Sequence, residues 1–301
     1  MIRVPQYVTR IEEGGINVRP QIEIGRETPV SALVDGDNGL GQVVMTLAAE
    51  TAIEKAMQMG MAWVGTVRSN HAGAAGVYTA LALERGLIGI YMAVASANVM
   101  PPWGGTDRLL GTNPISIAIP SGETPPLQLD IATTVASHGT IKVVEQAGGT
   151  LPEGWVIDSE GNPITDPKKA DDGFLMPIGG YKGSGLNIAI GLLAGVLNGA
   201  AFGDEVIDHR VVADQPANTG QALFVMRPDL FREIGEFKGS VDAHLEALRA
   251  SGGAGAVQLP GEQAAALESE SKRHGVTVSP VLLDQLQGLA DRLSLQDRLR
   301  D

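Results

Sequence analysis

The chain has 301 residues, with 22 Lys and Arg against 35 Asp and Glu, so its formal net charge is −13. This charge argues against a nucleic-acid binder, which needs a basic face, and against attachment to anionic lipid by a polybasic patch. The absence of cysteine excludes disulfides, thiolate metal sites and thiol catalysis, while 44% hydrophobic residues allow a large core.

The first half of the chain predicts helices that alternate with strands. Residues 42–59 repeat apolar positions at helical spacing and end at Gly60. A short strand over 62–67 and a loop that contains His71 lead into a second helix over 73–84. Further strands are expected from length and β-branched content at 87–95, 115–119 and 127–129.

The second half predicts more loops and helices than strands. Residues 135–146 predict a helix, 148–180 a proline-rich loop region and 221–226 a strand. After Pro228 the sequence is mainly helical, with a glycine-rich break at 252–256. We therefore expect a sheet domain in the middle of the chain and a second layer made by its two ends.

The longest apolar run is Gly185–Gly203, in which Gly191, Gly195, Gly199 and Gly203 follow a four-residue spacing. It contains two asparagines and lacks flanking positive charge, so it predicts a buried helix packed on a sheet or a partner subunit rather than a membrane span. The N-terminal residues lack the apolar stretch of a secretory signal, and we expect a cytoplasmic protein.

Several common motifs fail. The nearest candidate for a Rossmann fingerprint, Gly39-Leu40-Gly41-Gln42-Val43-Val44, has Val in place of the third Gly and follows no apolar strand. The glycines around Lys182 lack Walker A spacing, and no Gly-x-Ser-x-Gly elbow occurs. The five histidines contain no pair at metal-ligand spacing, so we expect no metal site.

Two segments carry candidate acid–base groups. His71 follows Ser69-Asn70 at a strand–helix junction, where Ser69 or Asn70 can cap the helix. An imidazole near neutrality suits proton transfer there, and a surface or capping histidine is the alternative. Asp130 ends a buried strand, where it either accepts a hydrogen bond from an imidazole or caps the following helix.

Three further segments carry candidate binding groups. Leu110-Gly111-Thr112-Asn113-Pro114 predicts either a ligand-facing loop or a structural turn. The glycines at 179–185 surround Lys182 before an apolar helix, which favours an anion site over a flexible loop. Arg3 and Tyr7 share one helix face, where a guanidinium and a phenol can hold a carboxylate.

These segments together resemble the non-Rossmann malate/L-lactate dehydrogenase family, which also includes sulfolactate, ureidoglycolate and diketogulonate dehydrogenases and piperideine-2-carboxylate reductases. The resemblance covers essentially the whole chain, in order. It is carried by Arg3…Tyr7, Asp35-Gly36…Asn38-Gly39-Leu40-Gly41, Ser69-Asn70-His71-Ala72-Gly73, Pro102…Gly104-Gly105, Leu110-Gly111-Thr112-Asn113-Pro114, Asp130-Ile131-Ala132-Thr133, Pro152-Glu153-Gly154-Trp155…Asp158, Thr165-Asp166-Pro167, Pro177-Ile178-Gly179-Gly180-Tyr181-Lys182-Gly183 and Leu259-Pro260-Gly261-Glu262.

The resemblance implies an α/β fold in which a three-layer mixed-sheet domain binds NAD or NADP without a Rossmann motif. It implies a cofactor domain over 61–226, with a helical domain built from 1–60 and 227–301. The expected activity is hydride transfer between nicotinamide and a malate- or lactate-like 2-hydroxy or 2-oxo acid, in a homodimer. A cyclic imine acid reductase, or an impaired homologue that binds only cofactor, is the alternative.

The resemblance also implies roles for single residues. His71 matches the acid–base group, Asp130 an aspartate near it, and Arg3 the arginine for the substrate carboxylate, with Tyr7 beside it. Cofactor contacts are implied for Ser96, Thr112, Asp130, Ile131, Ala132, Gly180, Lys182, Gly183, Gly261 and Glu262.

The N-terminus departs from the family pattern. Family members usually begin with a helical segment that ends in Ser-His-Gly just before the Arg…Tyr pair, and Met1 stands about where that tripeptide ends. The resemblance therefore implies weak or no turnover by the chain as written, and higher turnover once upstream sequence is restored.

Overall fold

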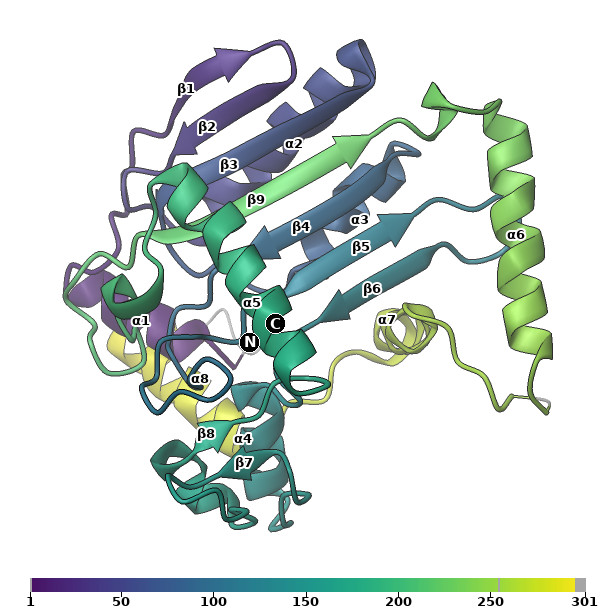
Figure 1. The fold of residues 1–301 in the computed structure, drawn as a ribbon. Helices are drawn as coiled ribbons and strands as arrows, with labels where there is room; N and C mark the ends of the chain where they lie inside the picture. Colours follow the sequence, from purple (N-terminus) through teal and green to yellow (C-terminus); the bar gives the residue numbers. More distant parts are fainter. Residues whose placement is uncertain (1, 254, 296–301) are drawn as a thin grey trace.

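A seven-stranded mixed sheet forms the centre of the computed structural model, which describes residues 2–253 and 255–295 (Figure 1). Its strand order is β1-β2-β3-β9-β4-β5-β6, and β7 pairs with β8 in a small separate ribbon. The strands are β1 (Glu23–Thr28), β2 (Ser31–Asp35), β3 (Met61–Ser69), β4 (Ile88–Ala93), β5 (Ile115–Ile119), β6 (Leu127–Ile131), β7 (Val156–Ile157), β8 (Phe174–Leu175) and β9 (Thr219–Met226).

Helices cover both faces of this sheet. The α-helices are α1 (Val4–Glu12), α2 (Gly41–Met59), α3 (Gly76–Glu84), α4 (His138–Gln146), α5 (Tyr181–Ala194), α6 (Ile234–Ala250), α7 (Glu262–His274) and α8 (Pro280–Arg292). Figure 1 shows α2 and α3 behind the sheet and α5 in front of it. The mixed α/β architecture with three layers is therefore confirmed.

Small residues let α2 lie close to the sheet. Ala48, Ala49, Ala52 and Ala56 are fully buried along one side of α2, where they pack against strand residues such as Val64. Since each alanine places only one methyl group between helix and strand, the two layers approach closely and form a dense core.

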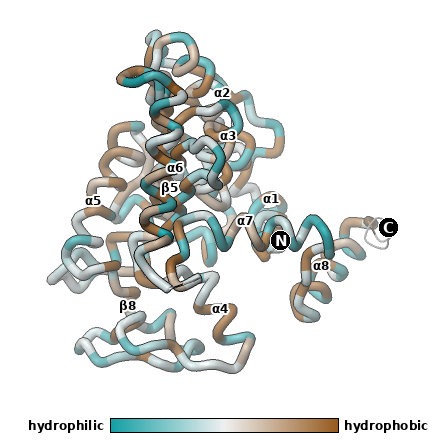
Figure 2. The backbone as a smooth tube through the Cα atoms, turned by 90° about the vertical axis from the view of Figure 1, so that its right-hand side faces the viewer, coloured by the Kyte–Doolittle hydropathy of each residue, from teal (hydrophilic) through white to brown (hydrophobic). Residues whose placement is uncertain are grey.

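The apolar run around α5 differs from its prediction. The α-helix ends at Ala194, so the glycine spacing does not continue as one helical stripe. Gly191 is required because a side chain there would overlap the ring of Phe202. Figure 2 shows α5 as largely hydrophobic, and its outer side exposes Leu192 and Leu193. Among the described residues, no helix is long and apolar enough to cross a membrane.

Two helices from opposite ends of the chain lie in contact. Helix α1 contacts α8, and Arg292 Nη2 lies 3.0 Å from Glu12 Oε2. Strands β1 and β2 also come from the first 60 residues, and β2 pairs with β3 in parallel. The N-terminal 60 residues therefore contribute to the central sheet as well as to the helical part that we expected of them.

Candidate active site

Helix α1 brings three polar side chains to one place. Arg3, at its N-terminal boundary, Tyr7 and Arg10 lie four and three residues apart and so share one helix face. Arg10 is 1% exposed and anchors the helix through its guanidinium. It donates to the backbone carbonyls of Gly15, Val212 and Gln215 at 3.0, 2.7 and 2.8 Å.

The loop that carries His71 is fixed by the residue before it. The Asn70 side-chain nitrogen donates to the backbone carbonyls of Asn38 and Gly39 at 3.0 and 2.9 Å. Gly41 lies against this loop, where any side chain would overlap the carbonyl of Asn70. The capping role proposed for Ser69 or Asn70 is wrong, because α3 begins only at Gly76 and the Asn70 amide is bound elsewhere.

A hydrogen-bonded chain sets the orientation of His71. The amide nitrogen of Gln42 donates to the Tyr7 hydroxyl oxygen at 2.9 Å, and that oxygen lies 2.6 Å from His71 Nδ1. Because the Tyr7 oxygen accepts from Gln42, its own proton is free to point to Nδ1. The Gly73 amide also donates to Nδ1, at 3.3 Å. Neutral His71 therefore carries its proton on Nε2.

His71 is held in its neutral form. Burial, together with the positive charge of Arg3, lowers the pKa of His71 to about 4. The ring of His209 lies 5.4 Å from that of His71, and burial lowers the pKa of His209 to about 3. An anion bound at Arg3 would remove one of the two causes that keep His71 neutral, so it would favour protonation of His71.

These groups border a cavity of about 450 Å³. Its lining includes three of the four predicted catalytic residues, Arg3, His71 and Asp130. Tyr7 does not line the cavity itself, but its hydroxyl contacts His71, which does. The cavity also brings together four of the predicted cofactor residues, which are Ser96, Thr112, Asp130 and Ala132.

Asp130 lies in this cavity without bonding to His71. Its carboxylate accepts a hydrogen bond of 2.7 Å from the Gly76 amide, at the start of α3. Desolvation by the surrounding protein raises the pKa of Asp130, and this hydrogen bond opposes the shift. Asp130 thus binds the start of α3, which precedes it in the sequence. Helix α4, which follows it, is capped by Ser137 instead.

The other predicted cofactor residues lie outside the cavity lining. Lys182 is exposed in the first turn of α5, and Gly183 packs so tightly that a side chain would overlap the carbonyl of Ile178. Glu262 forms an ion pair of 2.6 Å with Arg249. Ile131, Gly180 and Gly261 are likewise not part of the lining, so the roles of these six residues remain predictions.

Four polar residues of the site were not singled out from the sequence. His209, Arg210 and His138 line the cavity, and Gln42 orients Tyr7. The sequence offers only a weak signal for them. His209-Arg210 is a basic pair in an acidic chain, and Gln42 directly follows the glycine that ends the motif Asn38-Gly39-Leu40-Gly41.

Residues 1–287 match the family model for malate/L-lactate dehydrogenase. The chain belongs to this family. It is 37% identical over 298 residues to the L-sulfolactate dehydrogenase of Methanocaldococcus jannaschii, which covers 97% of this chain and 84% of that protein. The solved structure of that sulfolactate dehydrogenase has a TM-score of 0.88 with this chain. The resemblance seen in the sequence is therefore confirmed.

Two further relatives show how varied this family is. The chain is 32% identical over 280 residues to the ureidoglycolate dehydrogenase (NAD(+)) of Escherichia coli K12, with 92% of this chain and 79% of that one covered. It is 30% identical over 296 residues to a pyrroline- and piperideine-2-carboxylate reductase of Pseudomonas putida, with 97% and 84% covered. The family thus consists of oxidoreductases that act on hydroxy and oxo acids and related imines.

Proposed function

We propose that this protein is an NAD(P)-dependent oxidoreductase that transfers a hydride between nicotinamide C4 and the α-carbon of a malate- or lactate-like 2-hydroxy or 2-oxo acid. The observation that carries the proposal is the placement of His71 and Arg3 on one cavity, with His71 oriented by Tyr7. An acid–base group next to a fixed cation is what a 2-oxo acid needs, since it carries a reacting carbonyl beside a carboxylate.

The chain's own residues account for the binding and proton-transfer steps. The guanidinium of Arg3 binds the carboxylate and so directs the α-carbon and its oxygen toward His71. Charge neutralisation at Arg3 favours imidazolium formation, after which His71 Nε2 donates a proton to the carbonyl oxygen during reduction. In oxidation, neutral His71 accepts the proton of the hydroxyl group. Tyr7 keeps the ring in place through Nδ1.

The cavity offers polar groups that fit a nicotinamide cofactor. Ser96 is 6% exposed, and its Oγ is buried without a hydrogen-bond partner among residues 2–253 and 255–295. A buried hydroxyl without a partner is costly, so this one suits a polar group of a ligand. Thr112 and Asp130 border the same cavity. When bound, a nicotinamide supplies the hydride that no side chain can provide.

Absorbance at the nicotinamide band tests this function. Pyruvate, oxaloacetate and other 2-oxo acids would be offered with NADH and with NADPH, and we expect oxidation of one cofactor that depends on the acid. The His71→Gln variant should lose at least about 100-fold in turnover, which is the typical contribution of a general acid–base group. A near-normal rate in this variant would reject the role of His71.

Similarity to the P. putida reductase favours reduction of a cyclic imine acid as a second candidate function. Such a substrate also places a carboxylate next to the reacting carbon, so Arg3 and His71 would keep their roles. Adding Δ1-piperideine-2-carboxylate to the substrate panel separates the two. A higher kcat/KM for the imine than for every 2-oxo acid would favour this second function.

The resemblance also implies a homodimer, which remains a prediction for this chain. Light scattering on the purified protein measures the mass directly. The calculated mass of one chain is 31.4 kDa, so a particle of twice this mass is expected.

A further inference from the structure

The resting form of His71 carries only the proton that it would donate. That proton is on Nε2, because Tyr7 and Gly73 both donate to Nδ1. With a pKa of about 4, only about one His71 ring in a thousand carries a second proton at pH 7. In the proposed reaction Nε2 faces the carbonyl oxygen of the acid, so a second proton must reach the ring through Nδ1.

The Tyr7 hydroxyl is the group placed to supply this proton. Its oxygen lies 2.6 Å from His71 Nδ1, which is a short hydrogen bond, and its hydrogen points along that line because Gln42 donates to the oxygen from 2.9 Å. The Gly73 amide lies farther from Nδ1, at 3.3 Å, so it competes weakly for this nitrogen. A proton that moves from Tyr7 to Nδ1 therefore crosses one hydrogen bond and needs no movement of either ring.

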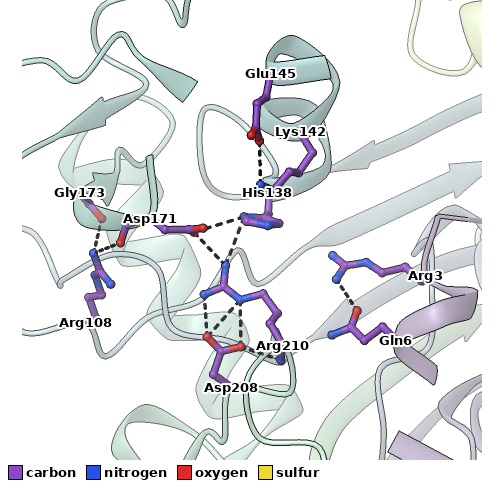
Figure 3. Close-up of polar contacts among 10 residues, drawn as sticks. All are labelled: Arg3, Gln6, Arg108, His138, Lys142, Glu145, Asp171, Gly173, Asp208 and Arg210. Atoms are coloured by element: carbon purple, nitrogen blue, oxygen red, sulfur yellow. Dashed lines mark hydrogen bonds and ion pairs between the residues drawn. The ribbon is translucent and has the colours of Figure 1, made fainter. Parts of the chain in front are cut away.

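Two neighbours stabilise the Tyr7 phenolate that such a transfer leaves. Burial raises the pKa of Tyr7, while the hydrogen bond from Gln42 and the charge of Arg3 oppose the rise. The same charge lowers the pKa of His71, so Arg3 favours the phenolate and disfavours the imidazolium. Its two effects on the pair offset each other. Figure 3 shows Arg3 bonded to Gln6, at 2.9 Å, which limits the movement of its guanidinium.

Three other titratable groups lie near this pair. The ring of His209 lies 5.4 Å from that of His71, and burial lowers its pKa to about 3. Burial raises the pKa of Tyr78 well above its ordinary value. His209 therefore stays neutral and Tyr78 stays protonated at neutral pH. Asp130 borders the same cavity, and any titration of its carboxylate would affect the wild type and the variants below alike.

The outer end of the chain of hydrogen bonds lies toward solvent. Tyr7 and Gln42 are half-buried, and a surface groove is lined by Gln42, Val43, Thr46, Leu47 and Glu50. Val43, Thr46 and Glu50 are exposed, so the groove is open to water. Solvent in the groove thus comes within one residue of the Tyr7 oxygen without entering the cavity. A proton can be replaced from this side while an acid is bound.

We propose that Tyr7 relays protons between solvent and His71. In reduction, the Tyr7 O–H bond breaks as its proton moves to Nδ1. The Nε2–H bond of the resulting imidazolium then breaks, and its proton bonds to the carbonyl oxygen, which receives the electron pair of the C=O bond as the hydride bonds to the α-carbon. Solvent in the groove returns a proton to the Tyr7 oxygen, and oxidation reverses these steps. This inference rests on the proposed function and adds proton transfer to the orienting role of Tyr7.

The pH dependence of reduction separates this relay from protonation by solvent. A proton from Tyr7 forms the imidazolium at a cost that does not depend on pH, whereas a proton from solvent becomes about tenfold scarcer with each pH unit. With pyruvate or oxaloacetate, whichever is reduced faster, wild-type kcat/KM should change less than about threefold between about pH 6 and 8. In Tyr7→Phe the loss should grow from about tenfold at pH 7 to about 100-fold at pH 8.

Two further variants identify the source of that loss. Gln42→Leu keeps the Tyr7 hydroxyl but removes the donor that stabilises its phenolate, so it should lower kcat/KM by about 10- to 100-fold, and by the same factor at every pH. Tyr181→Phe is the matched control, because it removes an exposed phenol on α5 that does not line the cavity. This variant should keep the wild-type profile.

Proton exchange in the free protein tests the relay without turnover. In an equal mixture of H₂O and D₂O, a tyrosine labelled with ¹³C at Cζ gives one signal if its hydroxyl exchanges quickly and two if it exchanges slowly. Tyr7→Phe identifies the signal of Tyr7. We expect a single signal, since the relay requires exchange with solvent at least as fast as a typical turnover of about 10 s⁻¹.

Three results would overturn the inference. The first is a wild-type kcat/KM that falls about tenfold with each pH unit above pH 6. The second is a loss in Tyr7→Phe that is the same at every pH, which would mean that Tyr7 only orients His71. The third is a split ¹³C signal for Tyr7. If no acid is reduced with either cofactor, the proposed function fails, and the ¹³C signal still decides whether Tyr7 exchanges its proton with solvent.

Discussion

Removing the positive charge of Arg3 should raise the pKa of His71. Together, burial and Arg3 lower this pKa from 6.5 to about 4, a cost of about 3 kcal/mol for the imidazolium. Burial is the larger cause, so Arg3→Gln should recover less than half of that cost. The pKa of His71 should therefore rise in this variant and stay below its ordinary value. Arg3→Lys, which keeps a charge, should change it less.

The assay is an NMR titration of the protein with labelled histidines, in which His71→Gln identifies the signal of His71. The unreactive 2-oxo acid analogue oxamate extends the test, because its carboxylate should neutralise Arg3. Bound oxamate should raise the pKa of His71 in the wild type, with uptake of protons measured by calorimetry in buffers of different ionisation enthalpy. The reasoning is refuted if Arg3→Gln leaves the pKa unchanged or lowers it.

Four further outcomes are expected. Tyr7→Phe should lower kcat/KM about tenfold in steady-state kinetics, because it removes one hydrogen bond to His71. An unchanged kcat/KM would show that this bond does not contribute to catalysis. In Gln42→Glu the new carboxylate should accept a hydrogen bond from the Tyr7 hydroxyl, so the Tyr7 oxygen should accept from His71 and the His71 proton should move to Nδ1. The ¹⁵N chemical shifts of the imidazole report this tautomer. Because the folded-state pKa of His71 is lowered to about 4, the free energy of unfolding should fall as the pH drops from about 6.5 to 4. His71→Gln should weaken this fall in urea titrations, while the exposed-site control His274→Gln should not. Arg10→Leu removes the hydrogen bonds that the guanidinium donates to the carbonyls of Gly15, Val212 and Gln215 and should lower the melting temperature, consistent with a loss of about 3 kcal/mol.

Local patterns were sufficient for most of the elements and for part of the site. The apolar spacing over 42–59 predicted α2 to within a residue, because helix periodicity and a terminal glycine are both local signals. The four-residue spacing of Arg3 and Tyr7 predicted their common helix face for the same reason. His71 was located because it follows a strand directly, and a strand end fixes the position of its loop.

Long-range pairing determined what the sequence could not reveal. Strand β9 inserts between β3 and β4, so it pairs with residues more than 120 positions away. This insertion brings the preceding loop, with His209 and Arg210, next to His71, and no local pattern contains that information. The capping role of Asn70 failed because its side-chain oxygen, which would cap a helix, accepts from the distant Arg10 Nη2 at 3.3 Å, while its side-chain nitrogen donates to Asn38.

Arg3, Tyr7 and Arg10 share one short helix, so the site forms only when this helix packs against the rest of the protein. A helix of nine residues is too short to persist in water alone, so α1 is helical because it is docked. Opening of this helix would remove Arg3, the proposed carboxylate-binding group, and Tyr7, the partner of His71, together while the sheet stays folded. Conversely, an acid bound at Arg3 adds its binding free energy to the docking of α1. Hydrogen exchange of the α1 amides should therefore slow when substrate binds, and catalytic competence and local stability should rise together.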